Sequence, residues 1–202
     1  MAPAKTPRRT QDERSRQTTG QLLAAARELF AADGYAATSL DAIADAAGVT
    51  KGAVYHHFES KRDIFRAVYA AEQKRLARLA AAAAERKRDP LDAFYEGCRA
   101  FLEVSLDPGV QRITLLDAPG ALGWETMREI ESDSLRMTQN GIEIAMKSGR
   151  LPKGPSGPLA HMLFGALCEA AMKIARAENP KAETRVTLRQ LRALLDGLAA
   201  QA

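Results

Sequence analysis

Apolar residues recur at helical spacing through most of the 202-residue chain. Near the N-terminus, Leu22, Ala26, Leu29 and Phe30 fall on one face of a helix. The same spacing returns after each break in the pattern, and no segment requires a strand. The pattern therefore predicts an all-α protein.

Glycine, proline and capping residues mark the ends of the predicted helices. The segment Asp33-Gly34 ends the first helix, and Thr38 has the position of an N-cap, with Asp41 replacing the glutamate of a capping box. Ser60 is predicted to cap a later helix in the same way. Breaks are also expected at Pro119-Gly120 and over 149–158. About nine helices result, over residues 16–33, 39–47, 51–58, 61–88, 90–106, a short one ending near 117, 122–147, 159–177 and 182–199.

The composition supports a helical protein. The chain has 39 alanines but only 13 valines and isoleucines together. Alanine is the best helix former, whereas β-branched residues favour strands. Apolar residues make up 46% of the chain, which is enough for a hydrophobic core.

The distribution of charge says more than the net charge of +4. Residues 1–16 carry five Lys and Arg against two acidic residues, whereas residues 17–66 carry five basic and six acidic residues. We expect a disordered basic arm over 1–15 that adds non-specific attraction to nucleic acid. Any DNA contact made by residues 17–66 must depend on the placement of individual side chains.

Neither a metal centre nor a membrane segment is predicted. Cys98 and Cys168 form no disulfide framework and no zinc-binding spacing. The chain has no signal-peptide run and no stretch of about 18 apolar residues. We expect a soluble, cytoplasmic protein without a metal or cofactor.

His161 and Cys168 are the one pair that would suggest a thiol–imidazole enzyme. Seven residues apart on one helix, they are separated by about 10.5 Å along its axis. A cysteine nucleophile needs a direct hydrogen bond to its histidine. We therefore expect no enzymatic activity.

The strongest functional signal is a pair of short helices joined by a glycine turn. Ala44, Gly48 and Val54 have the spacing Ala-x3-Gly-x5-Val. A small residue allows the helices to cross, the glycine allows the positive φ of the turn, and Val54 fills the wedge with Ile43 and Val49. This spacing is typical of a helix-turn-helix, whose second helix enters the DNA major groove.

The residues around the turn carry a family resemblance. The run TSLDAIADAAGVTKGAVYHHFESK, from Thr38 to Lys61, and the preceding Phe30-x3-Gly34-Tyr35 resemble the DNA-binding signature of the TetR (tetracycline-repressor-like) family. The close match covers about residues 18–69. The resemblance implies a three-helix DNA-binding domain, here over 16–64, and a helical ligand-binding and dimerisation domain over 65–202.

The resemblance also implies which residues contact DNA. Lys51 can reach a phosphate or a guanine edge, and Gly52 lets the backbone approach the DNA. Tyr55 and His56 would face the groove, although Tyr55 could be partly core and the histidines simply exposed. The complete set of expected DNA-binding residues is Thr38, Ser39, Thr50, Lys51, Gly52, Tyr55, His56, His57 and Lys61.

The last two predicted helices are candidates for a homodimer interface. The helix over 159–177 is apolar on two sides, so both sides should be buried. One face and the leucine row of the last helix would form a four-helix bundle with a second subunit. The alternative is that both helices pack only within one subunit. The residues expected in the interface are Leu159, Leu163, Ala166, Leu167, Ala170, Ile174, Leu188, Leu191, Leu195 and Leu198.

Large, soft side chains in the remaining helices suggest a pocket for a hydrophobic small-molecule effector. Ordinary core packing would explain each of them equally well, and the cavity itself is implied mainly by the resemblance. The candidate lining residues are Phe94, Cys98, Phe101, Trp124, Met127, His161, Phe164 and Cys168.

The predicted function is a sequence-specific transcriptional regulator, released as a repressor from a palindromic DNA operator by its effector. The alternative is an architectural DNA-binding protein without ligand control, which would bind through charge alone. The near-neutral residues 17–66 argue against that alternative.

Overall fold

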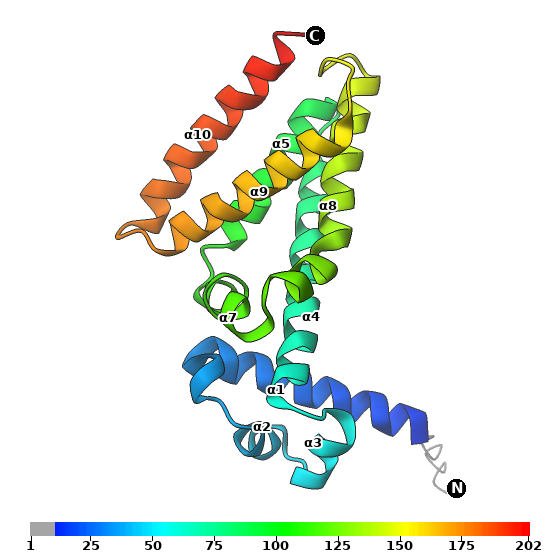
Figure 1. The fold of residues 1–202 in the computed structure, drawn as a ribbon, viewed down its shortest axis with the longest axis vertical. Coiled ribbons are helices and arrows are strands. Elements are labelled where there is room, and N and C mark those ends of the chain that lie inside the picture. Colours follow the sequence, from blue (N-terminus) through cyan, green and yellow to red (C-terminus); the bar gives the residue numbers. More distant parts are fainter. Residues whose placement is uncertain (1–10) are drawn as a thin grey trace, which may run out of the picture. The chain divides into compact units, whose positions relative to one another are not determined.

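The computed structural model describes residues 11–202, which form helices joined by turns and loops and contain no strand (Figure 1). This confirms the predicted all-α class. The helices number nine when the continuous stretch 108–122 is counted as one. The elements are α1 (Gln11–Ala37), α2 (Leu40–Ala47), α3 (Lys51–His57), α4 (Lys61–Ala84), α5 (Pro90–Val104), α6 (Pro108–Val110), a π-helical segment (Gln111–Asp117), α7 (Ala118–Leu122), α8 (Trp124–Lys147), α9 (Ser156–Ala175) and α10 (Pro180–Ala199).

The chain divides into two compact units between Val68 and Tyr69. This division lies four residues beyond the boundary expected from the sequence, within α4, so that helix belongs to both units.

The first unit packs α1 to α3 and the start of α4 around an aromatic core. Leu22, Ala26 and Phe30 of α1 are fully buried, as their spacing predicts. The ring of Phe30 meets Phe65 of α4 edge-on at 4.9 Å between ring centroids. Because α1 and α4 hold each other through these rings, the two short helices between them have a rigid support.

The ends of α1 differ from the prediction. The helix begins at Gln11, so residues 11–15 are helical rather than part of a disordered arm, and the expected arm over 1–10 lies outside the described residues. Asp12 and Glu13 in the first turn suit the positive end of the helix dipole. Gly34 interrupts the helical backbone with φ 85°, at the predicted stop.

Capping explains why the other helices begin where they do. Ser60 accepts from the backbone N–H of Asp63, as predicted, and Asp89 caps α5 with Pro90 at the first position. The expected break at Pro119-Gly120 is wrong, because α7 contains both residues and the chain turns at Gly123 instead. A proline in the first turn of a helix removes no helical hydrogen bond, so it does not end α7.

The second unit has its core between α5, α8, α9 and α10. Helices α5 and α8 approach closely at Gly141, where a Cβ atom would lie 2.8 Å from Cδ2 of Phe94. The core contains Leu91, Phe94, Cys98, Leu102, Ile142, Ala145, Leu151, Ala160, Leu163, Leu167, Ala171, Ile174 and Leu195.

Candidate nucleic-acid interface and effector domain

The turn between α2 and α3 has the geometry that its sequence predicts. Gly48 takes the left-handed conformation, with φ 66° and ψ 32°, and its N–H donates to the carbonyls of Ala44 and Asp45. The N–H of Val49 donates to Ala44 at 3.0 Å. A glycine is favoured here because other residues adopt positive φ only with strain.

Side chains on the inner faces of α2 and α3 fill the wedge between them. Ile43, Ala44 and Val54 are all fully buried. Ser39 caps α2 by accepting from Ala42, and Thr50 caps α3 by accepting from Ala53. The hydroxyls of these two predicted DNA-binding residues therefore already have structural partners, although both residues remain exposed.

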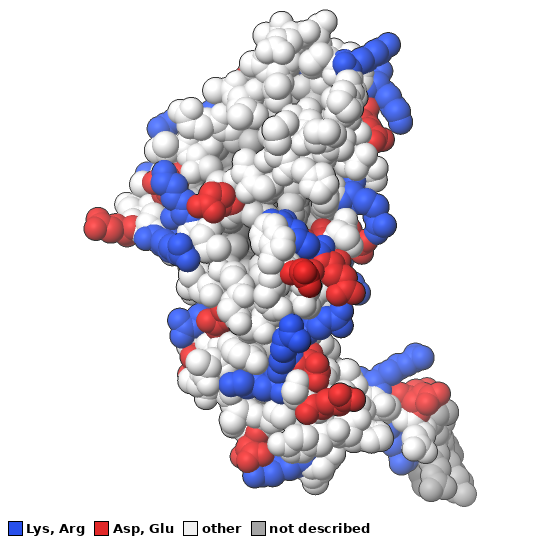
Figure 2. Space-filling model, viewed as in Figure 1, with Lys and Arg blue, Asp and Glu red and all other residues white. Residues whose placement is uncertain are grey.

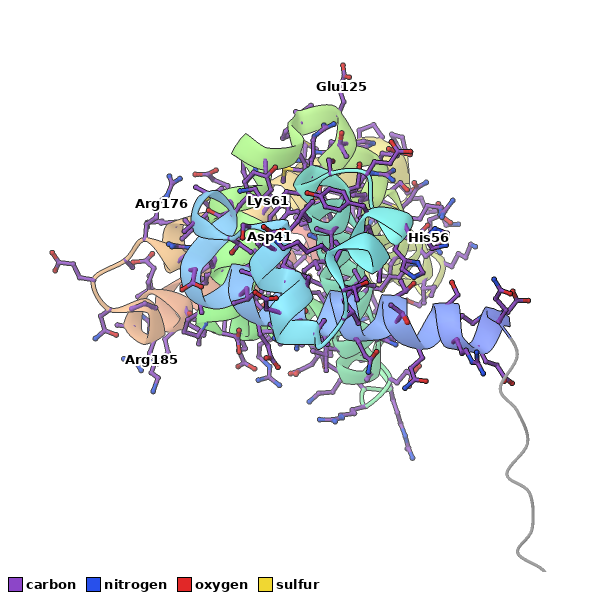
Figure 3. All side chains as sticks on the ribbon, turned by 90° about the horizontal axis from the view of Figure 1, so that it is seen from below. Asp41, His56, Lys61, Glu125, Arg176 and Arg185 are labelled. Atoms are coloured by element: carbon purple, nitrogen blue, oxygen red, sulfur yellow. The ribbon has the colours of Figure 1, made fainter. Side chains whose placement is uncertain are left out.

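The outer face of α3 is open to solvent. Lys51, Gly52, Tyr55 and His56 are exposed, and 57% of the large Tyr55 side chain is accessible. A Cβ atom on Gly52 would meet only the hydroxyl of Thr50, at 3.9 Å, so the fold does not require glycine there. His56 is labelled in Figure 3, at the end of α3. These four residues form a continuous accessible surface on the second helix of a helix-turn-helix.

Lys51 has a partner that the sequence did not indicate. Its Nζ donates to Oδ2 of Asp41 at 2.5 Å, and the hydrogen bond to Asp41 raises the pKa of Lys51. The two residues are ten positions apart, on different helices. Spacing within one helix could not identify this pair, because it depends on the crossing of α2 and α3.

Three other predicted DNA-binding residues have structural roles. The prediction that Thr38 is an N-cap is wrong: Thr38 is buried, and its hydroxyl donates to the carbonyl of Gly34 at 2.8 Å. A buried hydroxyl that is already paired is not available to a phosphate. His57 is half-buried, with Nδ1 3.3 Å from the hydroxyl of Thr19. Lys61 donates to the carbonyls of Tyr35 and Ala36, which leaves one N–H donor of its ammonium.

The predicted dimer face of α9 and α10 is largely the inner face of the subunit. Leu163, Leu167, Ile174 and Leu195 belong to the core and cannot form an outer surface. Leu159, Ala170, Leu188, Leu191 and Leu198 are partly buried and pack against the same core. The choice of face was therefore wrong for the four core residues, because α10 packs on α5 and α9. For the partly buried residues the interface stays a prediction. Ala166 alone of the set is exposed.

The opposite faces of α9 and α10 are exposed, and they are apolar or uncharged except toward the α9–α10 turn, where Glu169 and Lys173 continue the row of Met162 and Ala166. Met162 and Leu194 have 64% and 49% of their surface accessible, and Val186 has 43%. Small or uncharged residues separate them. Figure 2 shows a wide area without charged side chains over the second unit. We name this surface the outer face and define it as Met162, Ala166, Val186, Gln190, Ala193, Leu194 and Gly197.

The structure brings some of the candidate pocket residues together: the guanidinium of Arg128 lies 4.0 Å from the ring centroid of Trp124 and 5.4 Å from that of Phe164. Phe94, Cys98 and Phe101 belong to the core of the second unit or pack against it. Trp124 and His161 are exposed, so neither lines an interior cavity within the subunit. Met127, Phe164 and Cys168 are partly buried. A cleft of about 670 Å³ at the turn from α9 to α10 contains none of the eight.

A buried polar cluster joins α4 to α8 within the second unit. The hydroxyl of Tyr69 donates to Oε1 of Glu131 at 2.5 Å, and Arg128 donates to Oε2 at 2.9 Å. Burial, together with the charge of Glu131, raises the pKa of Tyr69. The guanidinium of Arg128 lies over the ring of Trp124, 4.0 Å from its centroid. No pattern in the sequence indicates this cluster, because Tyr69 and Glu131 are 62 residues apart.

Neither thiol is activated. Burial raises the pKa of Cys98 to about 12, and burial together with the charge of Glu131 raises the pKa of Cys168 to about 11. Both are therefore protonated thiols at neutral pH, and the thiolate is the reactive form. Within residues 11–202 no cluster of three or more His, Cys, Asp and Glu side chains is placed to hold a metal ion. No helix in this range is long and apolar enough to cross a membrane.

Two family models match the chain. The model described as bacterial regulatory proteins, tetR family, matches residues 22–68, and the tetracyclin repressor-like C-terminal domain matches residues 91–198. The two matches cover the helix-turn-helix and most of the second unit. The chain belongs to the TetR family of bacterial regulatory proteins.

Individual relatives agree with this assignment. A TetR-family transcriptional regulator from Pectobacterium atrosepticum is 33% identical, with a TM-score of 0.84 over 94% of this chain and 97% of that chain. The Transposon Tn10 TetC protein of Escherichia coli is 30% identical over 65% of this chain and 66% of its own length. FadR from Bacillus subtilis, solved in complex with stearoyl-CoA, is 20% identical with a TM-score of 0.71, over 85% of this chain and 96% of that chain. The chain spans only 33% of another relative, the regulator AcrR of Shigella flexneri.

Replacing Tyr69 with phenylalanine should destabilise the second unit by about 1–3 kcal/mol, because Glu131 would remain buried without one of its donors. Urea unfolding at a fixed protein concentration measures the change. Tyr95→Phe is the matched control, since its ring packs against the same core from a partly exposed position. Equal free energies of unfolding for the two variants would contradict the importance of the Tyr69–Glu131 hydrogen bond.

Proposed function

We propose that this protein is a sequence-specific DNA-binding transcriptional regulator, a repressor that leaves a palindromic operator when a hydrophobic small molecule binds the second unit. One observation carries the proposal: Lys51, Gly52, Tyr55 and His56 form an accessible surface on α3, supported by the buried wedge of the helix-turn-helix. The TetR-family assignment supports the same function.

The chemistry of this surface suits a DNA groove. The ammonium of Lys51 can donate to the O6 and N7 acceptors of guanine or to a phosphate. Tyr55 and His56 add a phenol and an imidazole, which can donate to base edges or accept from them. Because Gly52 has no side chain, the backbone of α3 can approach the DNA closely at that point. Ser39 and Thr50, both exposed at helix N-termini, would add phosphate contacts.

Substituting Lys51 with alanine should weaken operator binding without loss of stability, since the residue is exposed. We expect a loss of about 1–3 kcal/mol if Lys51 contacts a guanine. A gel-shift titration on an operator selected from genomic DNA, with random DNA in parallel, measures this. A smaller loss that is equal on both DNAs would indicate a phosphate contact. Unchanged operator affinity would exclude Lys51 from the interface.

The same titrations separate the regulator from the architectural alternative. A regulator binds its operator more tightly than random DNA at every salt concentration. A protein that binds through charge alone shows one affinity and one salt dependence for both. The near-neutral charge of residues 17–66 favours the regulator.

A homodimer would bring two recognition surfaces to one operator. One helix reads only a few base pairs, whereas two-fold symmetry doubles the site and makes it palindromic. The outer face of α9 and α10 is the surface best suited to a second copy, because the residues that define it carry no charge and its large side chains Met162, Val186 and Leu194 are exposed. Joined about a two-fold axis, α9 and α10 of two subunits would make a four-helix bundle.

Glutamate in place of Leu194 or Met162 should therefore convert the dimer to a monomer, because each change puts a charge into the apolar interface. Light scattering across a range of concentrations measures the assembly. Ile144→Glu is the matched control: Ile144 is 57% exposed but lies on α8, outside the outer face. A wild-type monomer would exclude the dimer, and dimers that survive both changes would exclude this face.

The aromatic side chains of the second unit would suit an apolar effector. Phe94, Phe101 and Phe164 lie in its core or partly buried at its edge. The structurally similar FadR was solved with stearoyl-CoA, a ligand with a long apolar chain. An effector that binds best to the conformation with low DNA affinity shifts the protein toward that conformation.

Effector binding should reduce operator affinity about 5- to 150-fold, corresponding to a coupling of about 1–3 kcal/mol. A screen of hydrophobic metabolites would follow operator release and, separately, the fluorescence of Trp124, the only tryptophan. Trp124 stacks on Arg128, so its emission reports on movement at the start of α8. Ligands that bind without changing DNA affinity would contradict the switch.

A further inference from the structure

The ion pair between Asp41 and Lys51 lies at the proposed DNA-reading surface rather than inside the fold. The side chains are 52% and 62% exposed, and the Nζ–Oδ2 distance is 2.5 Å. Asp41 belongs to the first turn of α2, and Figure 3 shows where it lies on that helix. In the free protein, the ammonium of Lys51, which we propose binds DNA, is therefore hydrogen-bonded to a carboxylate oxygen of Asp41.

The fold does not depend on this pair. Ser39 already caps α2, and the wedge of Ile43, Ala44 and Val54 holds α2 against α3. Exposed ion pairs contribute little to stability. The main consequence of the pair is that Lys51 has an acidic partner before DNA arrives.

We propose that Asp41 is an internal competitor for Lys51 that sets the affinity of this protein for DNA. The carboxylate is an anionic oxygen acceptor like a phosphate, so Lys51 exchanges one acceptor for another when it binds DNA. Part of the free energy of that contact is offset by the broken pair. This inference rests on the proposed DNA binding.

The competition lowers the affinity for all DNA sequences. Lys51 must leave Asp41 to contact an operator guanine, and it must also leave Asp41 to contact a phosphate on random DNA. Where a phosphate is too weak an acceptor to displace Asp41, Lys51 stays paired and contributes nothing. Removing Asp41 therefore helps operator binding at least as much as it helps random binding.

Asp41→Asn tests the proposal, because it removes the charge but keeps the size of the side chain. We expect operator affinity to rise by up to about fivefold, the equilibrium equivalent of an exposed ion pair, with an equal or smaller rise on random DNA. Asp45→Asn is the matched control: Asp45 is exposed on the same helix and acts on Lys51 only through its charge. Its effect should be smaller.

Introducing Asp41→Asn and Asp45→Asn into the Lys51→Ala variant tests whether a gain in DNA affinity depends on Lys51. The gain from Asp41→Asn must disappear there, because no ammonium remains to be released. A gain that persists without Lys51, or that Asp45→Asn reproduces in full, would reduce Asp41 to a general negative charge and overturn the proposal. Unchanged or weaker operator binding by Asp41→Asn would also overturn it, since Asp41 would then be neutral or would orient Lys51 for the contact.

A measurement without DNA separates this inference from the proposed function. In nuclear magnetic resonance titrations of the free protein, Asp41→Asn should lower the pKa of Lys51, because the pair raises it. No change in that pKa would show that the pair is absent in solution and would overturn the inference. If the pair is present but the wild-type protein selects no DNA site, the proposed function itself fails.

Discussion

The left-handed backbone at Gly48 is the constraint on which the proposed DNA-reading surface depends. That single residue reverses the chain between two helices of eight and seven residues. Helices of this length are marginal in isolation, so packing has to hold them. The turn brings Ile43 and Val54 together in a water-free wedge, and the burial of these apolar side chains fixes the angle between α2 and α3. The side of α3 that carries Lys51, Tyr55 and His56 is exposed because the opposite side packs into that wedge.

Helices α9 and α10 of the second unit likewise have one buried face and one exposed face. The large leucines of α9 and α10 point into the subunit, where they bury the most apolar surface against α5 and the rest of the core. Leu194 is the exception: with Met162 and Val186 it remains exposed on the outer face, among the small residues Ala166, Ala193 and Gly197. Small residues let helices approach closely, which suits an interface between copies better than the crowded inner rows. The same two helices can therefore stabilise the subunit and present exposed apolar side chains.

Local signals in the sequence were enough for most of the fold. The N-cap at Ser60, the proline after Asp89 and the glycine turn at Gly48 act within four residues, so they can be read directly from the chain. Thr38 and Ser39 show the limit of such signals: both are good caps, and only the packing that buries Thr38 decides between them. The choice of face in α9 failed for a similar reason, since periodicity reveals two apolar faces but not which one meets α5 and α8.

Contacts between residues far apart in the sequence could not be predicted from the spacing of residue types. Glu131 would be read as one more solvated glutamate of α8, yet it is buried, with hydrogen bonds from Tyr69 on α4 and from Arg128, three residues earlier on α8. A buried carboxylate is tolerated only with such partners. The pair also ties α8 to α4, the helix shared by both units, through a directional bond rather than through adaptable apolar packing.

The Asp41–Lys51 pair has a consequence for how such a regulator can be controlled. An effector shifts an equilibrium only by the difference between its affinities for two conformations, and this coupling is modest in proteins. A DNA complex held much more tightly than that coupling would not dissociate when the effector arrives. The carboxylate of Asp41 lowers the DNA affinity through its hydrogen bond to Lys51. It does not alter the backbone of α3, so the shape of the proposed recognition surface is unchanged. For the proposed effector-controlled regulator, a single exposed aspartate on α2 would therefore lower the DNA affinity that effector binding has to overcome.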